Sequence, residues 1–308
     1  MASFWRRVRA AVAAGLAAAA LAPALFAGRS ADVRAEAQRL LNEGVTAYKN
    51  GEFSTAVERL QRCADIALNN FRAYYYLGLA QIGDRRYRPA IDSLKIALEL
   101  DPKHLSSLVA LGDANLKLGD LDEAQAAYYR ALKARPEFAA ALDGLGRLSE
   151  ARGDNDQAIE QYKRAIASDK GFAPPYSNLG SLYLGLDRVD DAVRLLEEAV
   201  SIQPDYAPGL NRLARAYGRV GLINQAVATV QKAIQLDPKN PAHPATLGGL
   251  QLALGSSGPA ERSFRQALAL DPAQPDARRG LAELARRRGE YAQAREELAQ
   301  ALADPRLD

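Results

Sequence analysis

The residues that could carry out chemistry in this 308-residue sequence are few and scattered. Its one cysteine, Cys63, has no second thiol to pair with, and its two histidines, His104 and His243, lie far apart. The sequence contains neither a Gly-Lys-Ser/Thr phosphate loop nor a His-Glu-x-x-His zinc motif. Adjacent carboxylates such as Glu197 and Glu198 point in different directions on a helix. We therefore expect no catalytic residue, no metal site and no cofactor.

One group of polar residues is better suited to binding than to catalysis. Arg215 and Arg219 are one helical turn apart, and Asn211 precedes them by one more turn. Because a guanidinium group binds a carboxylate through two parallel hydrogen bonds, this trio could hold an acidic side chain or a C-terminal carboxylate. The alternative is a solvated helix face with ordinary ion pairs.

These residues lie in a sequence that repeats itself every 34 residues. A register that begins at Ala37 divides the chain into eight blocks without insertion, and position 20 of every block is alanine. Position 27 is alanine in every block except the first, where Cys63 takes its place, so we expect Cys63 to be a packed small residue. The blocks are 37–70, 71–104, 105–138, 139–172, 173–206, 207–240, 241–274 and 275–308.

Each block is predicted to form two amphipathic helices, because apolar residues return at intervals of three and four. Position 8 is glycine in six blocks and alanine in two. Glycine inside a helix costs about 1 kcal/mol relative to alanine, so its return at one position indicates a close helix–helix approach. Pairs such as Asp101-Pro102 end one block, and turns such as Gly119-Asp120 join its two helices.

This pattern resembles the tetratricopeptide repeat family over about nine-tenths of the chain. The resemblance implies an all-α fold, a right-handed α-solenoid of eight helical hairpins that contact only their neighbours. The first helix of each hairpin, called helix A, would line a concave groove, and the second is called helix B. The carboxylate clamp of chaperone-binding members needs Lys and Asn at set positions, which no three successive blocks supply.

The resemblance also implies that ligands contact positions 2, 5, 9, 12 and 13 of helix A. In blocks one to three these positions are apolar or aromatic, which predicts a hydrophobic peptide-binding groove. The alternative is that curvature of the superhelix, or residues 28–36 folding back, covers them. In blocks four to six they are mostly polar. The residues concerned are Leu41, Val45, Tyr48, Tyr75, Leu79, Ile82, Val109 and Leu116, then Asp143, Arg147, Glu150, Ser177, Ser181, Asn211, Arg215 and Arg219.

Blocks seven and eight depart from the pattern. In block seven, Pro241 and Pro244 lie at the start of helix A and the turn between its helices is Ser256-Ser257-Gly258-Pro259, so we expect a weak or frayed repeat. In block eight, Arg295 and Asp304 replace apolar residues, which suits a terminal repeat that is solvated at its open end. His104 lies at a turn between repeats, where we expect it to be solvated.

The N-terminal segment has the order of a secretory signal. Residues 1–9 carry three arginines, residues 10–28 carry no charge, and small residues crowd the end of that stretch, with cleavage expected after Ala24 or Ala27. The alternative is an uncleaved anchor formed by residues 10–28, because a membrane span needs about 20 apolar residues. Since the basic end stays inside in both cases, we expect the rest of the chain to be exported, periplasmic or secreted.

The charge balance argues against nucleic acid as a partner. The whole chain carries a net charge of +3, and the three arginines of residues 1–27, which hold no acid, account for it. The neutral remainder gives no electrostatic reason to bind nucleic acid, and we expect membrane contact only if the segment stays uncleaved. Residues 28–36 are assigned to a short linker or the start of the first helix.

Together these observations predict a non-enzymatic scaffold that binds a protein or peptide segment outside the cytoplasm. Exported proteins that resemble this one serve envelope assembly, or polysaccharide or pilus secretion, and that analogy is one of fold alone. The alternative is a substrate-recruiting or regulatory subunit of a separate enzyme, such as a glycosyltransferase.

Overall fold

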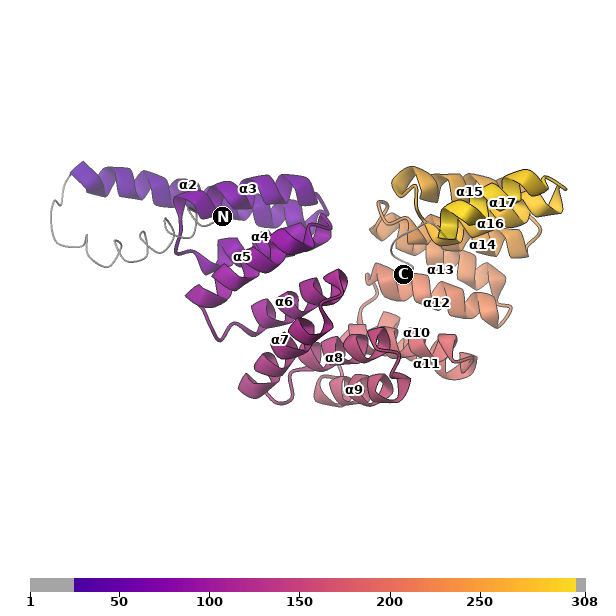
Figure 1. Cartoon of the computed structure of the whole chain (residues 1–308), viewed down its shortest axis with the longest axis horizontal. Helices are drawn as coiled ribbons and strands as arrows, with labels where there is room; N and C mark the ends of the chain where they lie inside the picture. The colour runs from indigo at the N-terminus through magenta and orange to yellow at the C-terminus, as the bar shows by residue number, and fades with distance from the viewer. Residues whose placement is uncertain (1–24, 303–308) are drawn as a thin grey trace. The chain divides into compact units, whose positions relative to one another are not determined.

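The computed structural model describes residues 25–302, which contain sixteen helices and no strand, so the all-α class is confirmed for this range (Figure 1). The chain divides into unit 1, which ends at Arg152, and unit 2, which begins at Gly153. The helices of unit 1 are α2 (Leu25–Lys49), α3 (Phe53–Ile66), α4 (Phe71–Gly83), α5 (Tyr87–Leu100), α6 (Leu105–Leu118), α7 (Leu121–Ala134) and α8 (Ala139–Ala151). The helices of unit 2 are α9 (Asn155–Ser168), α10 (Ala173–Gly185), α11 (Val189–Ile202), α12 (Ala207–Arg219), α13 (Ile223–Leu236), α14 (Ala242–Ala253), α15 (Ser257–Leu270), α16 (Pro275–Arg287) and α17 (Tyr291–Leu302).

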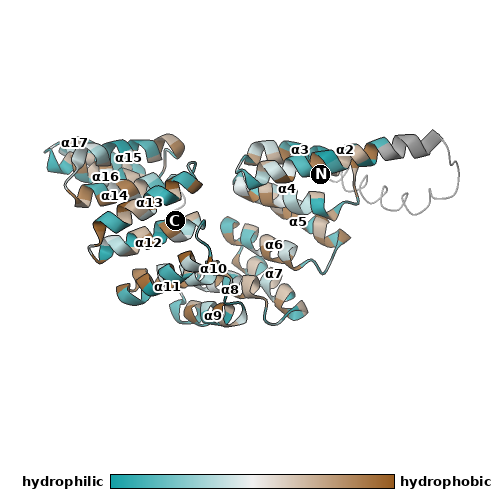
Figure 2. Ribbon diagram, turned by 180° about the vertical axis from the view of Figure 1, so that it is seen from behind, coloured by the Kyte–Doolittle hydropathy of each residue, from teal (hydrophilic) through white to brown (hydrophobic). Residues whose placement is uncertain are grey.

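Within each unit the helices stack in chain order. A helix A contacts the helix B that follows it, and that helix B contacts the next helix A. Helices A of successive repeats also contact one another, as α10, α12, α14 and α16 do in unit 2. Figure 2 shows hydrophobic and hydrophilic residues on the same helices, as expected when each helix buries only one face.

Most of the predicted targeting segment, residues 1–27, lies outside the described residues, and only its last three residues are seen, in the first turn of α2. Residues 28–36 continue α2 as one uninterrupted helix, so they do not fold back over it. None of the helices between residues 25 and 302 is both long enough and apolar enough to span a membrane.

Every turn between helix A and helix B holds one residue with positive φ at position 15 of its block. Six of these residues are glycines, such as Gly119 with φ of 86°, which has no Cβ atom to clash. The exceptions are Arg85 and Asp187, with φ of 58° and 61°. Because left-handed backbone disfavours other residues by about 1–2 kcal/mol, these six glycines serve the turn itself.

Glycines on helices A make room for large aromatic side chains from helices B. Tyr128 of α7 is fully buried against Gly112 of α6 and Gly144 of α8, and a Cβ atom at either glycine would collide with its ring. These glycines thus face a large side chain of a neighbouring helix, whereas the sequence predicted only that the helices approach closely. The equivalent set in unit 2 is Phe264, Gly248 and Gly280.

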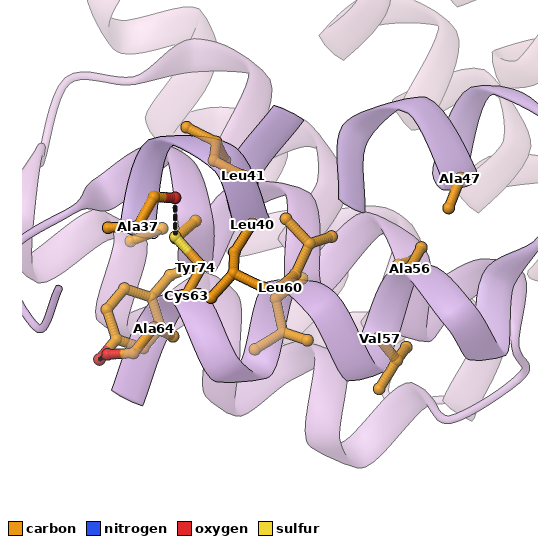
Figure 3. Packing of buried hydrophobic residues seen from close by; sticks show 14 of the residues in the cluster. Ala37, Leu40, Leu41, Ala47, Ala56, Val57, Leu60, Cys63, Ala64 and Tyr74 are labelled. Carbon is orange, nitrogen blue, oxygen red and sulfur yellow. Dashed lines mark hydrogen bonds between the residues drawn. The ribbon is translucent and has the colours of Figure 1, made fainter. Parts of the chain in front are cut away.

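The first repeat shows how these small positions build a core (Figure 3). Leu40 and Leu60 are fully buried there, and burying one such side chain stabilises the fold by about 1.5–3 kcal/mol. Cys63 lies in the same cluster, where its Sγ atom donates a hydrogen bond to the carbonyl oxygen of Ala37 at 3.2 Å. The prediction that Cys63 is a packed small residue is confirmed.

The fraying expected at the start of block seven is not observed. Pro241 lies at the N-cap of α14, and Pro244 lies in its first turn, where no intrahelical N–H bond is needed. In block eight, Arg295 is exposed as expected, whereas Asp304 lies outside the described residues. However, α17 also exposes apolar side chains, including Tyr291 at 67%, so its outer face is less polar than predicted.

Candidate functional site

A groove in unit 2 is lined by the helices A of four successive repeats. It has a volume of about 640 Å³ and crosses α10, α12, α14 and α16. Because these helices contact one another in order, their inner faces form one continuous surface. Ligands bind preferentially in such concave sites. The residues that define this groove, called the unit 2 groove below, are Ser181, Leu184, Arg212, Arg215, Arg219, Thr246, Gly249, Leu252, Ala253, Asp276, Arg279 and Glu283.

Two arginines of α12 are held in place by residues of the preceding repeat. Nη1 of Arg212 donates hydrogen bonds to Ser177 Oγ at 2.9 Å and to Asn178 Oδ1 at 2.7 Å. Nη2 of Arg219 donates to Asp187 Oδ1 at 2.5 Å. The predicted contact residue Ser177 is thus buried and supports an arginine. Both Arg212 and Arg219 line the unit 2 groove, and Arg219 is the more exposed of the two.

Arg215 lies between them on α12, is exposed, and has no hydrogen-bond or ion-pair partner among the described residues. Side chains 34 residues apart meet on neighbouring helices A, as the Arg212–Asn178 bond illustrates. The corresponding neighbours of Arg215 are Ser181 and Gly249, and neither carries a charge. The N–H donors of Arg215 therefore remain available.

The middle of the groove, on α14, carries no charge. Gly249 is exposed, and a Cβ atom at this position would meet no atom within 4 Å. Thr246, Leu252 and Ala253 line the same part of the groove. The combination of open space with short or apolar side chains can accommodate an apolar group beside the arginines.

The far wall of the groove, on α16, carries both signs of charge. Asp276 forms an ion pair with Arg279. Glu283 accepts hydrogen bonds from Arg286 and Arg287, which lower its pKa to about 2. The two acids of this wall are therefore already neutralised by arginines of their own helix.

Of the eight apolar contact residues predicted in unit 1, one is buried in the core and seven are partly buried. Leu41 is only 3% exposed because it packs in the cluster formed by α2, α3 and α4, so its assignment to an open groove is wrong. The others are partly buried and pack against the cores of successive repeats. They are Val45, Tyr48, Tyr75, Leu79, Ile82, Val109 and Leu116.

Aromatic rings on this face of unit 1 contact one another. The ring centroid of Tyr75 lies 5.1 Å from that of Tyr76 and 4.9 Å from that of His104. The ring centroids of Tyr48 and Tyr76 are 6.2 Å apart. Edge-to-face contacts of this kind add stability beyond the area buried. Much of the predicted hydrophobic surface is therefore used for packing between helices.

The arginine of unit 1 in the register of Arg215 is Arg147, and it is fully engaged. Its Nη2 lies 2.7 Å from Asp113 Oδ1, and its Nε lies 3.1 Å from Asp143 Oδ2. Tyr128 Oη donates a further hydrogen bond of 2.7 Å to Asp113. Burial alone would lower the pKa of Arg147, but Asp113 and Asp143 outweigh it and raise the pKa. The predicted contact residues Asp143 and Arg147 thus form a structural network.

Asn211 does not join the two arginines with which it was predicted to act. It is only 7% exposed, does not line the unit 2 groove, and its Oδ1 atom has no hydrogen-bond partner among the described residues. The structure brings together Arg215 and Arg219 and adds Arg212, Gly249 and Glu283. Reading the helix A positions beyond block six would have identified Gly249 and Glu283, which occupy position 9 of the last two blocks.

The two histidines differ in burial, since His104, which was expected to be solvated, is partly buried and His243 is buried. His104 caps the N-terminus of α6, where its Nδ1 accepts a hydrogen bond from the Ser107 backbone N–H at 3.2 Å. His243 is 1% exposed, and neither ring nitrogen has a hydrogen-bond partner among the described residues. Burial lowers the pKa of His243, and the carboxylate of Asp237, 3.9 Å away, opposes this only partly. Burial likewise raises the pKa of the Cys63 thiol, which makes it a poor nucleophile.

Two models of the tetratricopeptide repeat match the sequence. One matches residues 41–104 and 109–172, and the other matches residues 149–216, 183–247 and 252–308. None of the curated proteins matches the chain.

Solved structures give the same picture of the fold. The chain is similar to one in the crystal structure of the APC/C hetero-tetramer Cut9-Hcn1, with a TM-score of 0.68 and 20% identity. That match covers 86% of this chain but 52% of the other, so this chain spans about half its length. A second match, to pilF of Pseudomonas aeruginosa, has a TM-score of 0.52 and 20% identity and covers 63% of this chain and 88% of that one. The repeat-solenoid class predicted from the sequence is thereby confirmed.

Proposed function

The chain belongs to the tetratricopeptide repeat family, and from this premise we propose that it is a non-catalytic scaffold that holds a segment of a partner protein in the unit 2 groove. Tetratricopeptide repeats in general mediate contacts between proteins. The observation that supports this site is that four successive helices A line one groove of about 640 Å³. A continuous concave surface of this kind suits an extended segment better than a small molecule.

The proposal of a protein partner also rests on charge. The three arginines of residues 1–27 account for the net charge of the whole chain. Nucleic-acid binding draws most of its affinity from phosphate contacts with a basic surface, which an overall neutral remainder does not favour.

We further propose that the scaffold acts outside the cytoplasm, in envelope assembly or in polysaccharide or pilus secretion. The support is the basic start, uncharged middle and small-residue end of residues 1–27. Fusing alkaline phosphatase after residue 302 tests this directly, since the enzyme is active only where disulfides form. Activity that persists after residues 1–27 are deleted would contradict export by this segment.

Blocking the unit 2 groove tests the binding site. Gly249→Trp places an indole ring in the groove from a position where a Cβ atom would meet no atom within 4 Å. Gly258→Trp on α15 is the matched control, since Gly258 is exposed and lies outside the groove. We expect the partners that copurify with the unaltered chain to be lost with Gly249→Trp and kept with Gly258→Trp. Equal recovery with both variants would show that the groove is not the binding site.

A further inference from the structure

We propose that the unit 2 groove selects an extended protein segment by one acidic side chain, which binds Arg215, and by an adjacent apolar side chain, which lies over Gly249. This inference rests on the proposed function, because it names the chemistry of the segment that the groove holds. Each part of it follows from the placement of charge and space in the groove.

Arg215 is the residue that binds the acidic side chain, because its neighbours on α10 and α14 offer it no carboxylate. The equivalent Arg147 in unit 1 receives a carboxylate from Asp113, 34 residues earlier, at 2.7 Å. The residues 34 positions before and after Arg215 are Ser181 and Gly249, and both line the groove with it. A carboxylate from another molecule is the group that would complete its hydrogen bonds, in the paired geometry that guanidinium groups favour.

The arginines on either side strengthen the site without filling it. Arg212 uses only Nη1 in its bonds to Ser177 and Asn178, so its remaining N–H groups are available. Arg219 is held by Asp187 at 2.5 Å. Because two hydrogen bonds already hold Arg212, binding an anion beside it costs less side-chain entropy than ordering a free arginine would.

The other helices of the groove do not neutralise the positive charge of the arginines on α12. The part of the groove on α14 is uncharged, and the acids of α16 are engaged by arginines of their own helix. Of the four arginines that line the groove, Arg279 pairs with Asp276 and Arg219 pairs with Asp187. Arg212 and Arg215 are left without a carboxylate partner among the described residues, so the complementary segment is acidic.

The apolar side chain of the bound segment is inferred from the open space beside Arg215. A Cβ atom at Gly249 would meet no atom within 4 Å, and Leu252 and Ala253 line the groove on the same helix. Packed helix axes are about 8–10 Å apart, so four helices A span roughly 25–30 Å. An extended segment of about eight residues covers that span. Because α12 is the second of the four helices, the acidic residue is internal to the segment rather than at a chain end.

The test uses nonapeptides that are acetylated and amidated, so that no terminal charge contributes. A positional-scanning library of these peptides, with one position fixed as Asp, Glu, Asn, Gln, Lys or phosphoserine, is incubated with the full-length chain. The strongest binder is then measured by fluorescence anisotropy against Arg215→Gln. The matched control is Arg164→Gln, which removes an exposed arginine of α9.

We expect Asp and Glu to be selected over Asn and Gln, and Arg215→Gln to weaken binding at least about tenfold. Replacing the acid by its amide in the peptide should then cost little further affinity, because the two changes remove the same contact. Arg164→Gln should leave binding unchanged.

Three results would overturn the proposal: no selected peptide, no preference for Asp and Glu over the other fixed residues, or an equal loss in Arg215→Gln and Arg164→Gln. The proposed function is judged separately through Gly249→Trp. A neutral peptide that Gly249→Trp displaces would leave the groove as the binding site and remove only the acidic assignment. A peptide indifferent to Gly249→Trp would remove both.

Discussion

Arg147 in unit 1 and Arg215 in unit 2 occupy the same position of their repeats, yet they have opposite roles. Arg147 lies between Asp113 and Asp143 and is part of a network that includes Tyr128. Arg215 is exposed and has no partner among the described residues. The difference comes from two neighbouring positions. The residue 34 positions earlier is Asp113 for Arg147 and Ser181 for Arg215, and the residue four positions earlier is Asp143 for Arg147 and Asn211 for Arg215.

The comparison teaches that a position in a repeat does not determine whether its side chain is available. In a stack of hairpins each side chain on a helix A meets the equivalent side chains of the repeats before and after it. An oppositely charged neighbour makes the position structural, and a small neighbour leaves it open for a ligand. The predictions below test this difference, from the largest expected effect on stability to the smallest.

Removing Arg147 should destabilise the protein far more than removing Arg215. Arg147→Ala leaves Asp113 and the buried Asp143 without their cation, which we expect to cost about 2–3 kcal/mol. Arg215→Ala removes no hydrogen bond or ion pair among the described residues, so its effect should stay within about 0.5 kcal/mol. Urea unfolding followed by circular dichroism measures both, and similar values for the two variants would refute the distinction.

Two adjacent glycines of α14 test whether the space beside Arg215 is open. In Gly248→Ala the new Cβ would lie 2.6 Å from the Phe264 ring, so we expect a loss of about 1–3 kcal/mol from overpacking. In Gly249→Ala it meets nothing, and the better helix propensity of alanine should stabilise the chain by about 0.5–1 kcal/mol. Thermal unfolding should therefore shift in opposite directions. A shift in the same direction would contradict the open groove.

His243 extends the comparison to a buried group that has no hydrogen-bond partner among the described residues. Its folded pKa lies below its ordinary value of 6.5, because burial disfavours the charged ring. Its contribution to stability should therefore be present above pH 6.5 and be lost as the pH falls below that value, where the unfolded chain takes up the proton first. The equivalent position holds a buried alanine at Ala73, Ala141 and Ala277, so His243→Ala is a compatible control.

We expect unfolding free energies measured between pH 7.5 and 5 to fall less steeply for His243→Ala than for the unaltered chain. Parallel pH profiles for the two proteins would show that His243 is not responsible for the decline.

Giving Arg215 the neighbour that Arg147 has should close the binding site with little effect on the fold. Ser181→Asp places a carboxylate 34 residues before Arg215, and an exposed pair of this kind changes stability by less than about 1 kcal/mol. Binding of acidic nonapeptides should weaken several-fold, while Ser181→Asn should bind as before. Unchanged affinity with Ser181→Asp would mean that the side chains at positions 181 and 215 do not contact each other.

The repeat architecture of this protein was determined by its sequence alone. Alanine at position 20, small residues at positions 8 and 27, and proline between blocks all mark local events: a close helix approach, a turn or a helix end. Because each hairpin packs on its neighbours at a constant spacing of 34 residues, the same pattern that forms one pair also stacks the next. The buried role of Cys63 followed from this register, since its position is alanine in every other block.

Only the tertiary structure decided which inner residues are free to bind. Leu41 and Asn211 occupy positions that face a ligand in similar proteins, yet both are buried here. Arg147 and Arg215 are the same residue type at the same position, and they differ because Asp113 reaches one while Ser181 and Gly249 stand beside the other. Availability is a property of side chains that meet across separate repeats, so the pattern within one repeat does not contain it.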